Sequence, residues 1–168
     1  MKNILSIAFS LLLGLSLSAQ EKRASPLLKE STEIKGTKIS WQYGQPSKKG
    51  REIFGKLVPY GKIWRTGANE ASVISFSKDV MIEGKKLAAG KYALFSIPGE
   101  DKWTIIFNTI WNQWGAYNYE NDKDALRVKV SPNTAEESEK FTMTLSEEGV
   151  MTLHWDKTSA SFKIETAD

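Results

Sequence analysis

The chain has 168 residues, with 23 Lys or Arg, 20 Asp or Glu and no Cys, and its formal net charge is +3. The absence of cysteine excludes disulfides, thiol chemistry and lipid attachment through a cysteine behind a signal sequence. A charge so nearly balanced gives no basis for nucleic-acid binding, and we expect no nucleic-acid partner.

The first nineteen residues differ from everything that follows. Lys2 precedes an apolar stretch at residues 4–17, and small residues close it just before Gln20. This is the pattern of a secretory signal peptide, and the stretch is short for a membrane span. We therefore expect cleavage after Ala19, no membrane span in the mature chain, and a periplasmic or secreted protein. An uncleaved anchor is the alternative, disfavoured because no basic stop-transfer cluster follows.

Residues 20–30 are polar and without a period, and we expect them to form a flexible leader. The remaining length suits one domain, which we place at residues 31–168. No internal repeat or low-complexity tract divides it.

Apolar and polar residues then alternate with a period of two, which indicates strands with one buried and one wet face. The alternating segments are 37–43, 72–76, 102–108, 126–130, 141–146, 151–156 and 161–165. Residues 91–98 are apolar on both faces and predict a central strand covered on both sides.

Short turn signals separate these segments, and no helical period is sustained anywhere. The turn signals are Lys35-Gly36, Glu83-Gly84, Pro98-Gly99 and Glu148-Gly149. Short connections require antiparallel neighbours, so the sequence predicts an all-β fold, an antiparallel sandwich or squat barrel of about eight to ten strands. The expected core contains Trp41, Phe76, Leu94, Phe107, Val128, Leu145, Leu153 and Phe162.

Sequence motifs for phosphate, zinc and calcium binding are incomplete in this chain. Residues 84–92 resemble a phosphate-binding loop but have the wrong spacing and no Ser or Thr at the magnesium position. His154 is the only histidine, and the Asp122–Asp124 spacing lacks the glycine and glutamate of a calcium loop. We expect no metal and no cofactor.

The stretch Trp-Arg-Thr-Gly-Ala-Asn-Glu at residues 64–70 concentrates polar chemistry around one glycine. Gly67 adopts a positive φ at no steric cost, so a sharp turn would place Arg65 and Glu70 on the same rim. Arg65 offers a planar fork for a carboxylate or phosphate, and Asn69 offers a donor and an acceptor. Two hypotheses stay open: a ligand site, or a turn pinned by an Arg65–Glu70 ion pair.

A second candidate lies at residues 111–119, Trp-Asn-Gln-Trp-Gly-Ala-Tyr-Asn-Tyr. Flat rings and amides together can bind the face of a sugar or a peptide. Here we single out Gln113, Trp114 and Tyr117. The structural alternative is an aromatic cluster that closes one end of the sandwich, with Trp114-Gly115 as a packed turn.

The chain resembles the bacterial family known as domain of unknown function 2911. The resemblance is carried by Lys49-Gly50-Arg51, by residues 64–70, by residues 87–99 and by Gln113-Trp114-Gly115, in that order. It covers most of the chain, from about Ser25 to Val130. It implies a secreted or periplasmic protein and no established activity, substrate or catalytic residue.

Three functional hypotheses follow. The first is a non-enzymatic sandwich that binds a small molecule, an envelope glycan, an acidic oligosaccharide or a peptide, using the candidate residues Arg51, Trp64, Arg65, Asn69, Glu70, Gln113, Trp114 and Tyr117. The second is a hydrolase or lyase with Glu70 as acid or base, Arg65 holding an anionic group and His154 assisting. The third is a purely structural or assembly role. The sequence leaves the oligomeric state open.

Overall fold

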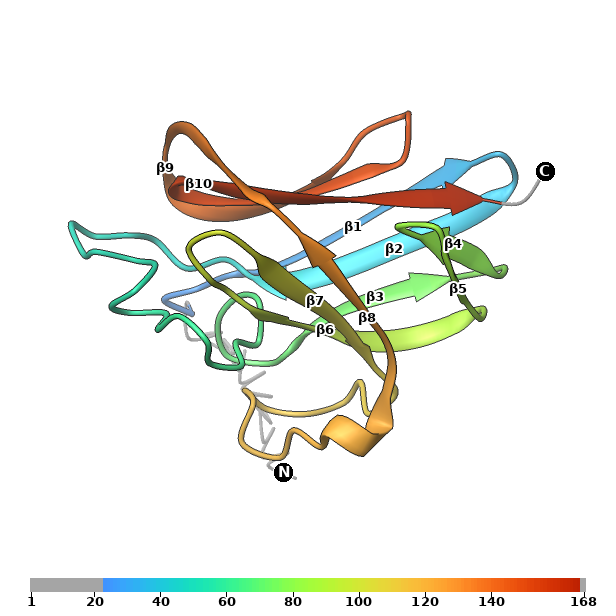
Figure 1. Ribbon diagram of the computed structural model, residues 1–168, viewed down its shortest axis with the longest axis horizontal. Coiled ribbons are helices and arrows are strands. Elements are labelled where there is room, and N and C mark those ends of the chain that lie inside the picture. Colours follow the sequence, from blue (N-terminus) through green and yellow to red (C-terminus); the bar gives the residue numbers. More distant parts are fainter. Residues whose placement is uncertain (1–22, 167–168) are drawn as a thin grey trace, which may run out of the picture.

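A computed structural model describes residues 23–166, which form two antiparallel β-sheets packed face to face (Figure 1). Six strands form one sheet in the order β1-β2-β3-β6-β7-β8, and four form the other in the order β5-β4-β10-β9. The all-β prediction is confirmed, as an open sandwich of ten strands over the described residues. The strands are β1 Leu27–Ile34, β2 Thr37–Gly44, β3 Ser72–Phe76, β4 Val80–Ile82, β5 Lys85–Leu87, β6 Gly90–Ile97, β7 Trp103–Asn108, β8 Asp124–Val130, β9 Pro132–Leu145 and β10 Val150–Thr166.

Tight turns join sequence neighbours where the turn signals predict them. Lys35 and Gly36 connect β1 to β2 with φ of 46° and 71°, and Glu83 and Gly84 connect β4 to β5 with φ of 49° and 72°. Two successive residues with positive φ match the twist of a two-residue hairpin. The β4–β5 hairpin lies between β3 and β6 in sequence but belongs to the other sheet, so the chain changes layers there and again at Ser131.

The main core lies between the two sheets, where the inward residues of both meet. Seven of the eight predicted core residues are buried there, and Leu145, near the end of β9, is partly buried and packs against the same cluster. The long β9–β10 ribbon, orange to red in Figure 1, supplies much of the second layer. Period-two alternation therefore identified the core correctly.

A second, smaller core covers the outer face of the six-stranded sheet. Ala93 and Phe95 of β6 pack there with Ile106 of β7, and Tyr119 and Ala116 from the loop after β7 cover them. The predicted double burial of β6 is confirmed: Tyr92 and Leu94 face the main core while Ala93 and Phe95 face this outer one.

The boundaries differ from expectation at the first and last strands. β1 begins at Leu27, so residues 27–30, expected in the leader, pair with the end of β2. β9 starts at Pro132, nine residues before the alternating segment. Residues 132–140 are mostly polar on both faces of this edge strand, so the sequence shows no alternation that would have revealed them. The last two predicted strands are one continuous strand, β10, with irregular register around Asp156. The expected signal peptide lies outside the described residues.

Candidate functional site

Short hydrogen bonds tie the loop at residues 64–70 to the sheet. Trp64 exchanges backbone hydrogen bonds with Ser96 of β6, at 2.8 and 2.9 Å. Thr66 is buried, and its Oγ1 lies 2.9 Å from the Ser96 Oγ. Ser72 Oγ donates to the Thr66 carbonyl at 2.6 Å. The loop is thus a rigid platform, which fixes the directions of the side chains that it carries.

Two glycines permit the loop to dock on the end of β2. Gly67 adopts a φ of 152°, in the region the sequence predicts for it. Ala68 N donates to Gly44 O at 3.1 Å, and a Cβ on Gly44 would lie 2.0 Å from the Ala68 carbonyl oxygen. This close approach requires glycine at position 44.

The two segments selected from the sequence lie side by side. Gly115 N donates to Asn69 O at 2.9 Å, and Ala71 N donates to Gln113 O at 3.1 Å, so Glu70 and Trp114 are opposed in an antiparallel bridge. These contacts join residues more than forty positions apart in the chain. The 111–119 segment is therefore packed through its backbone onto the 64–70 loop.

Arg65 and Glu70 do not pair with each other. Glu70 instead forms a hydrogen-bonded ion pair with Arg23, and both side chains are 37% exposed. Within residues 23–166 Arg65 has no carboxylate partner, and its Nε is buried without a hydrogen-bond acceptor. Gln113 Oε1 is likewise buried and unpaired in this part of the chain. The turn is well tied, but the Arg65–Glu70 ion pair of the structural alternative is not formed.

A pocket of about 310 Å³ lies against the 64–70 loop, and four of the predicted site residues line it: Arg51, Trp64, Arg65 and Asn69. Its walls are otherwise mainly apolar, with Leu57, Val58 and Trp155 among them, and no Asp or Glu lines it. Trp64 and Trp155 stack with centroids 6.1 Å apart. The pocket therefore combines two cations with a flat apolar wall.

Arg51 is held in place by its own loop. Its Nε and Nη2 donate to the carbonyl oxygens of Lys48 and Ser47, at 2.8 and 2.6 Å. Lys48 is anchored in turn by ion pairs to Asp156, at 2.7 Å, and to Glu137. The mostly buried Lys48 thus fixes the loop on the β9–β10 ribbon, and with it the position of Arg51.

The remaining candidates lie outside this pocket. Trp114 and Tyr117 are 58% and 82% exposed, and Glu70 and Gln113 belong to the backbone bridge beside it. A Cβ on Gly115 would lie 2.9 Å from the Tyr117 ring and 3.9 Å from Arg65 Nη1, so this ring and the guanidinium flank the same glycine. The exposed Tyr117 ring therefore lies close to Arg65.

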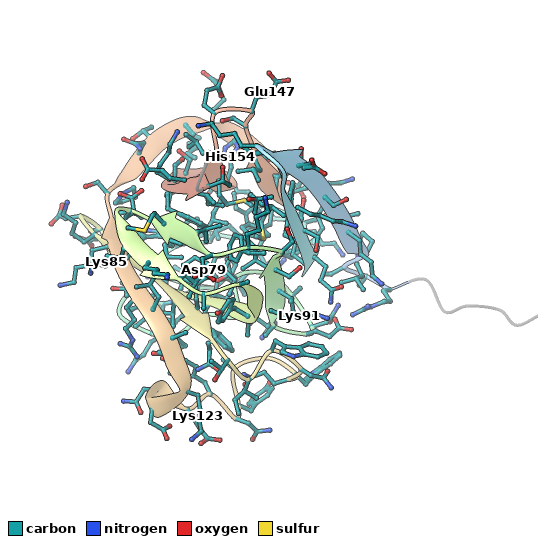
Figure 2. The ribbon with its side chains drawn as sticks, turned by 90° about the vertical axis from the view of Figure 1, so that its right-hand side faces the viewer. Asp79, Lys85, Lys91, Lys123, Glu147 and His154 are labelled. Carbon is teal, nitrogen blue, oxygen red and sulfur yellow. The ribbon has the colours of Figure 1, made fainter. Side chains whose placement is uncertain are left out.

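His154 is not near the pocket. It lies on β10, and its Nε2 is 2.8 Å from the Glu136 carbonyl oxygen on β9. Figure 2 labels it on the four-stranded sheet, in the strand that follows the turn at Glu147. In the structure His154 contacts Glu136 and Glu70 contacts Arg23, so His154 is not a hydrogen-bond partner of the carboxylate that it was expected to assist.

The ionisation of Glu70 also bears on that hypothesis. Burial raises the pKa of Glu70, but hydrogen bonds from Arg23 and from its own backbone N–H, with the Arg23 charge, outweigh this and lower the pKa below the ordinary value. Glu70 is consequently ionised at neutral pH and has no proton to donate as a general acid. The lowered pKa therefore argues against Glu70 as a general acid, whereas an ionised carboxylate can still accept a proton.

Sequence reasoning missed several pocket residues. Trp155 was predicted only as part of the alternating segment 151–156, and Ser25, Pro46 and Leu57 were not considered as site residues. No local signal marks them, because strand pairing and the long 45–63 connection bring them together. Within residues 23–166 there is no cluster of three or more His, Asp or Glu placed to hold a metal. The same part of the chain contains no helix long and apolar enough to cross a membrane.

Comparison with known proteins adds one finding. The model of a family described as a protein of unknown function, DUF2911, matches residues 25–164. The match extends beyond the region where the resemblance was visible, through β9 and most of β10. No curated protein and no solved structure matches the chain.

Proposed function

The chain belongs to the DUF2911 family, whose function is unknown, and we propose that it is a periplasmic or secreted binding protein for an anionic ligand. The ligand is an acidic end group, the terminal carboxylate of a peptide or the uronic acid of an envelope oligosaccharide. It enters the pocket beside Arg65 and is held without chemical conversion.

One observation carries the proposal: the pocket has two arginines and no carboxylate among its lining residues. The half-buried Arg65 guanidinium has lost part of its hydration, and no carboxylate among the described residues offsets the free-energy cost of that loss. A ligand carboxylate would supply the missing acceptor through charge-assisted hydrogen bonds, and the planar fork of Arg65 suits two of them at once.

The shape of the pocket limits the ligand. A volume of about 310 Å³ is at the lower end of the range for small-molecule sites, so it fits one end group and not a whole polymer. Trp64, Trp155 and Val58 offer an apolar wall on which a sugar face or an apolar residue can pack. Asn69 adds an amide, although its Nδ2 already donates to the Ser25 carbonyl at 3.3 Å.

The compartment expected from the sequence agrees with this choice of ligands. The apolar stretch that follows Lys2 has the anatomy of a secretory signal, and the chain contains no cysteine to be oxidised outside the cytoplasm. Acidic glycans and peptide ends are the anions that such a protein meets at the cell envelope.

Fluorescence titration tests the proposal directly, because two of the six tryptophans line the pocket. We would titrate a tripeptide with a free carboxyl end against its amide, and galacturonic acid against its methyl ester. The acids should change the emission saturably, and the neutral partners should not. Arg65→Lys should weaken binding about tenfold or more, since it loses the bidentate fork.

Lys129→Gln is the control, because Lys129 is an exposed cation on β8 that does not line the pocket. It should bind the acids as the unmodified protein does. Equal affinity of Arg65→Lys and the unmodified protein, or no response to either acid at millimolar concentration, would retire the proposal and leave a structural turn.

A further inference from the structure

A second concavity lies on the outer face of the six-stranded sheet, away from the Arg65 pocket. It has a volume of about 380 Å³ and crosses four neighbouring strands, β1, β2, β3 and β6. None of its lining residues lines the Arg65 pocket. Neighbouring strands lie about 4.8 Å apart, so the groove extends for about 14 Å. That length suits a short chain molecule and not a single end group.

Strand register gives the groove a polar floor. Ser31 of β1 faces Ser40 of β2, Ser40 faces Ser75 of β3, and Ser75 faces Lys91 of β6. The hydroxyls of Ser40 and Ser75 lie 2.7 Å apart. Gln42 lies in the next row and also lines the groove. Hydroxyls and an amide can exchange hydrogen bonds with sugar hydroxyls in either direction.

The groove is cationic. Lys29, Lys38 and Lys91 line it, and none of the three has an ion-pair partner among residues 23–166. Glu30 is the one acidic residue among those that line the groove. Because it lies between Lys29 and Ser31 on β1, its side chain points to the opposite face of the sheet. On that side burial and then the charge of Glu30 raise the pKa of Tyr43. An occupant of the groove therefore meets three lysines on the outer face, and Glu33, which faces Lys38 in register, lies just outside the lining.

One of these cations is held in place by an aromatic ring. Lys91 Nζ lies 3.6 Å from the centroid of Trp111, which comes from the loop after β7 and is 40% exposed. Figure 2 places Lys91 between the blue β1–β2 hairpin and the pale loop that follows β7. A cation–π contact limits the freedom of the lysine side chain, so less entropy is lost when an anion binds it. Trp111 thus positions Lys91 at the end of the groove.

We infer that this groove binds an acidic oligosaccharide, a short chain of uronic acid residues lying across the four strands. Carboxylates along the chain pair with Lys29, Lys38 and Lys91, and ring hydroxyls bond to Ser40, Ser75 and Gln42. The charge of the lining selects the occupant: a neutral glycan would leave three cations uncompensated, and the hydroxyl-rich floor suits a polyhydroxylated chain. This site is independent of the end-group pocket.

Calorimetric titration with a galacturonate oligomer, and with its fully methyl-esterified form, tests the inference. The acidic oligomer should bind and the ester should not. Lys91→Gln should weaken binding about tenfold, as expected for the loss of one charge-assisted hydrogen bond. Trp111→Leu, which keeps Lys91 but removes the ring beneath it, should weaken binding by a smaller factor. Lys129→Gln removes the same charge from an exposed position on β8, outside the groove, and should have little effect.

Ser75→Arg separates a shaped groove from simple ion exchange. It adds a positive charge but fills the floor, so a groove predicts weaker binding while ion exchange predicts tighter binding. Equal or tighter binding by Ser75→Arg, equal losses in Lys91→Gln and Lys129→Gln, or binding of the ester would overturn the inference. The oligomer also carries an end group that fits the Arg65 pocket, so the same titrations are repeated in the Arg65→Lys background. The binding that remains there and is lost in Lys91→Gln belongs to the groove, so failure of the pocket and failure of the groove are distinguishable.

Discussion

Gly44 is the single residue on which the docking of the 64–70 loop depends most. A Cβ at this position would lie 2.0 Å from the Ala68 carbonyl oxygen, a backbone atom that cannot rotate away. We expect Gly44→Ala to cost about 3 kcal/mol of unfolding free energy, at the upper end for overpacking. Gly50→Ala is the control, since nothing lies within 4 Å of its added methyl and only its φ of 70° is unfavourable.

The left-handed conformation alone should cost Gly50→Ala about 1 kcal/mol. Urea unfolding of both variants measures the difference. A loss in Gly44→Ala no larger than that in Gly50→Ala would mean that the loop and β2 separate easily.

The ion pair between Glu70 and Arg23 predicts a pH dependence. Because hydrogen bonding lowers the pKa of Glu70 in the folded state, its stabilisation is present above the unfolded pKa and is lost as pH falls through the folded value. Both side chains are more than a third exposed, so Glu70→Gln should cost at most about 1 kcal/mol at pH 7.

This difference from the unmodified protein should disappear in strongly acidic solution, which urea unfolding at a series of pH values measures. A loss of about 3–5 kcal/mol at pH 7 would instead indicate a fully buried pair and contradict the exposure of Glu70.

At this scale the sequence predicted the chemistry of the site but not its pairing. Arg65 and Asn69 do share one concavity, and Gly67 does take a positive φ. The partner of Glu70 could not be predicted, because Arg23 lies 47 residues earlier and reaches it only after β1 pairs with β2. Spacing along the chain favours Arg65 as the ion-pair partner of Glu70, whereas the pairing of β1 with β2 brings Arg23 to it instead.

Among the elements, the loop at residues 109–123 depends most on polar contacts. The buried Asn108 donates to Glu120 O and to Asp124 Oδ1, at 2.9 and 2.8 Å. Tyr119 OH donates to Asp124 Oδ2 at 2.6 Å and accepts from Arg127 Nη2 at 2.6 Å. Figure 1 shows this loop at the end of β7 and before β8. The network fixes the loop that carries Trp111, Trp114 and Tyr117.

Tyr119→Phe should therefore loosen the loop, costing about 1–2 kcal/mol for a hydrogen bond to a charged group. Burial, followed by the contact with Asp124, raises the pKa of Tyr119 to about 12. A raised pKa means that the stabilisation is complete below the unfolded value near 10 and is lost as pH rises through about 12.

Unfolding free energies at pH 9 and above pH 11 measure this, and the difference between the two proteins should shrink at the higher pH. Tyr43 and Tyr92 also have raised pKa values, and they are present in both proteins. A difference that stays constant with pH would show that the Tyr119 hydroxyl is not coupled to Asp124.

Strand positions could be predicted wherever one face is buried, because alternation then reports the pleat. Alternation gives no signal where both faces of a strand are polar. Residues 132–140 form the exposed half of β9, an edge strand that pairs with β10 and contacts the segment after β2 through a bridge between Ser47 and Lys140. Because polar and charged residues lie on both faces of this half of the strand, the sequence shows no period-two alternation there.

For the whole molecule, the sequence predicts that the mature protein begins at Gln20. Expressed in a bacterium with its own leader, the protein should lose residues 1–19 and be recovered outside the cytoplasm. Intact-mass measurement of the periplasmic and culture fractions checks this. A full-length chain in the membrane pellet would show that the apolar stretch is an anchor.

The fold class was predictable and the pocket was not. Alternation and short turns suffice for an antiparallel sandwich, since they determine which face of each strand is buried. The pocket is assembled from the segment before β1, the 45–63 connection, the 64–70 loop and β10. Which of these distant segments meet depends on strand order, and strand order has no local signature in the sequence.

The shift in melting temperature on adding an acidic ligand, compared between the unmodified protein and Arg65→Lys, tests the proposed binding function most directly. Without ligand the two proteins should differ by at most about 0.5 kcal/mol, because Arg65 has no carboxylate partner among the described residues. With a free-carboxyl tripeptide or galacturonic acid at one hundred times its dissociation constant, the unmodified protein should gain about 2.7 kcal/mol. Arg65→Lys should gain much less at the same concentration. Equal ligand-induced gains, or a strongly destabilised Arg65→Lys with no gain in either protein, would contradict the proposed site.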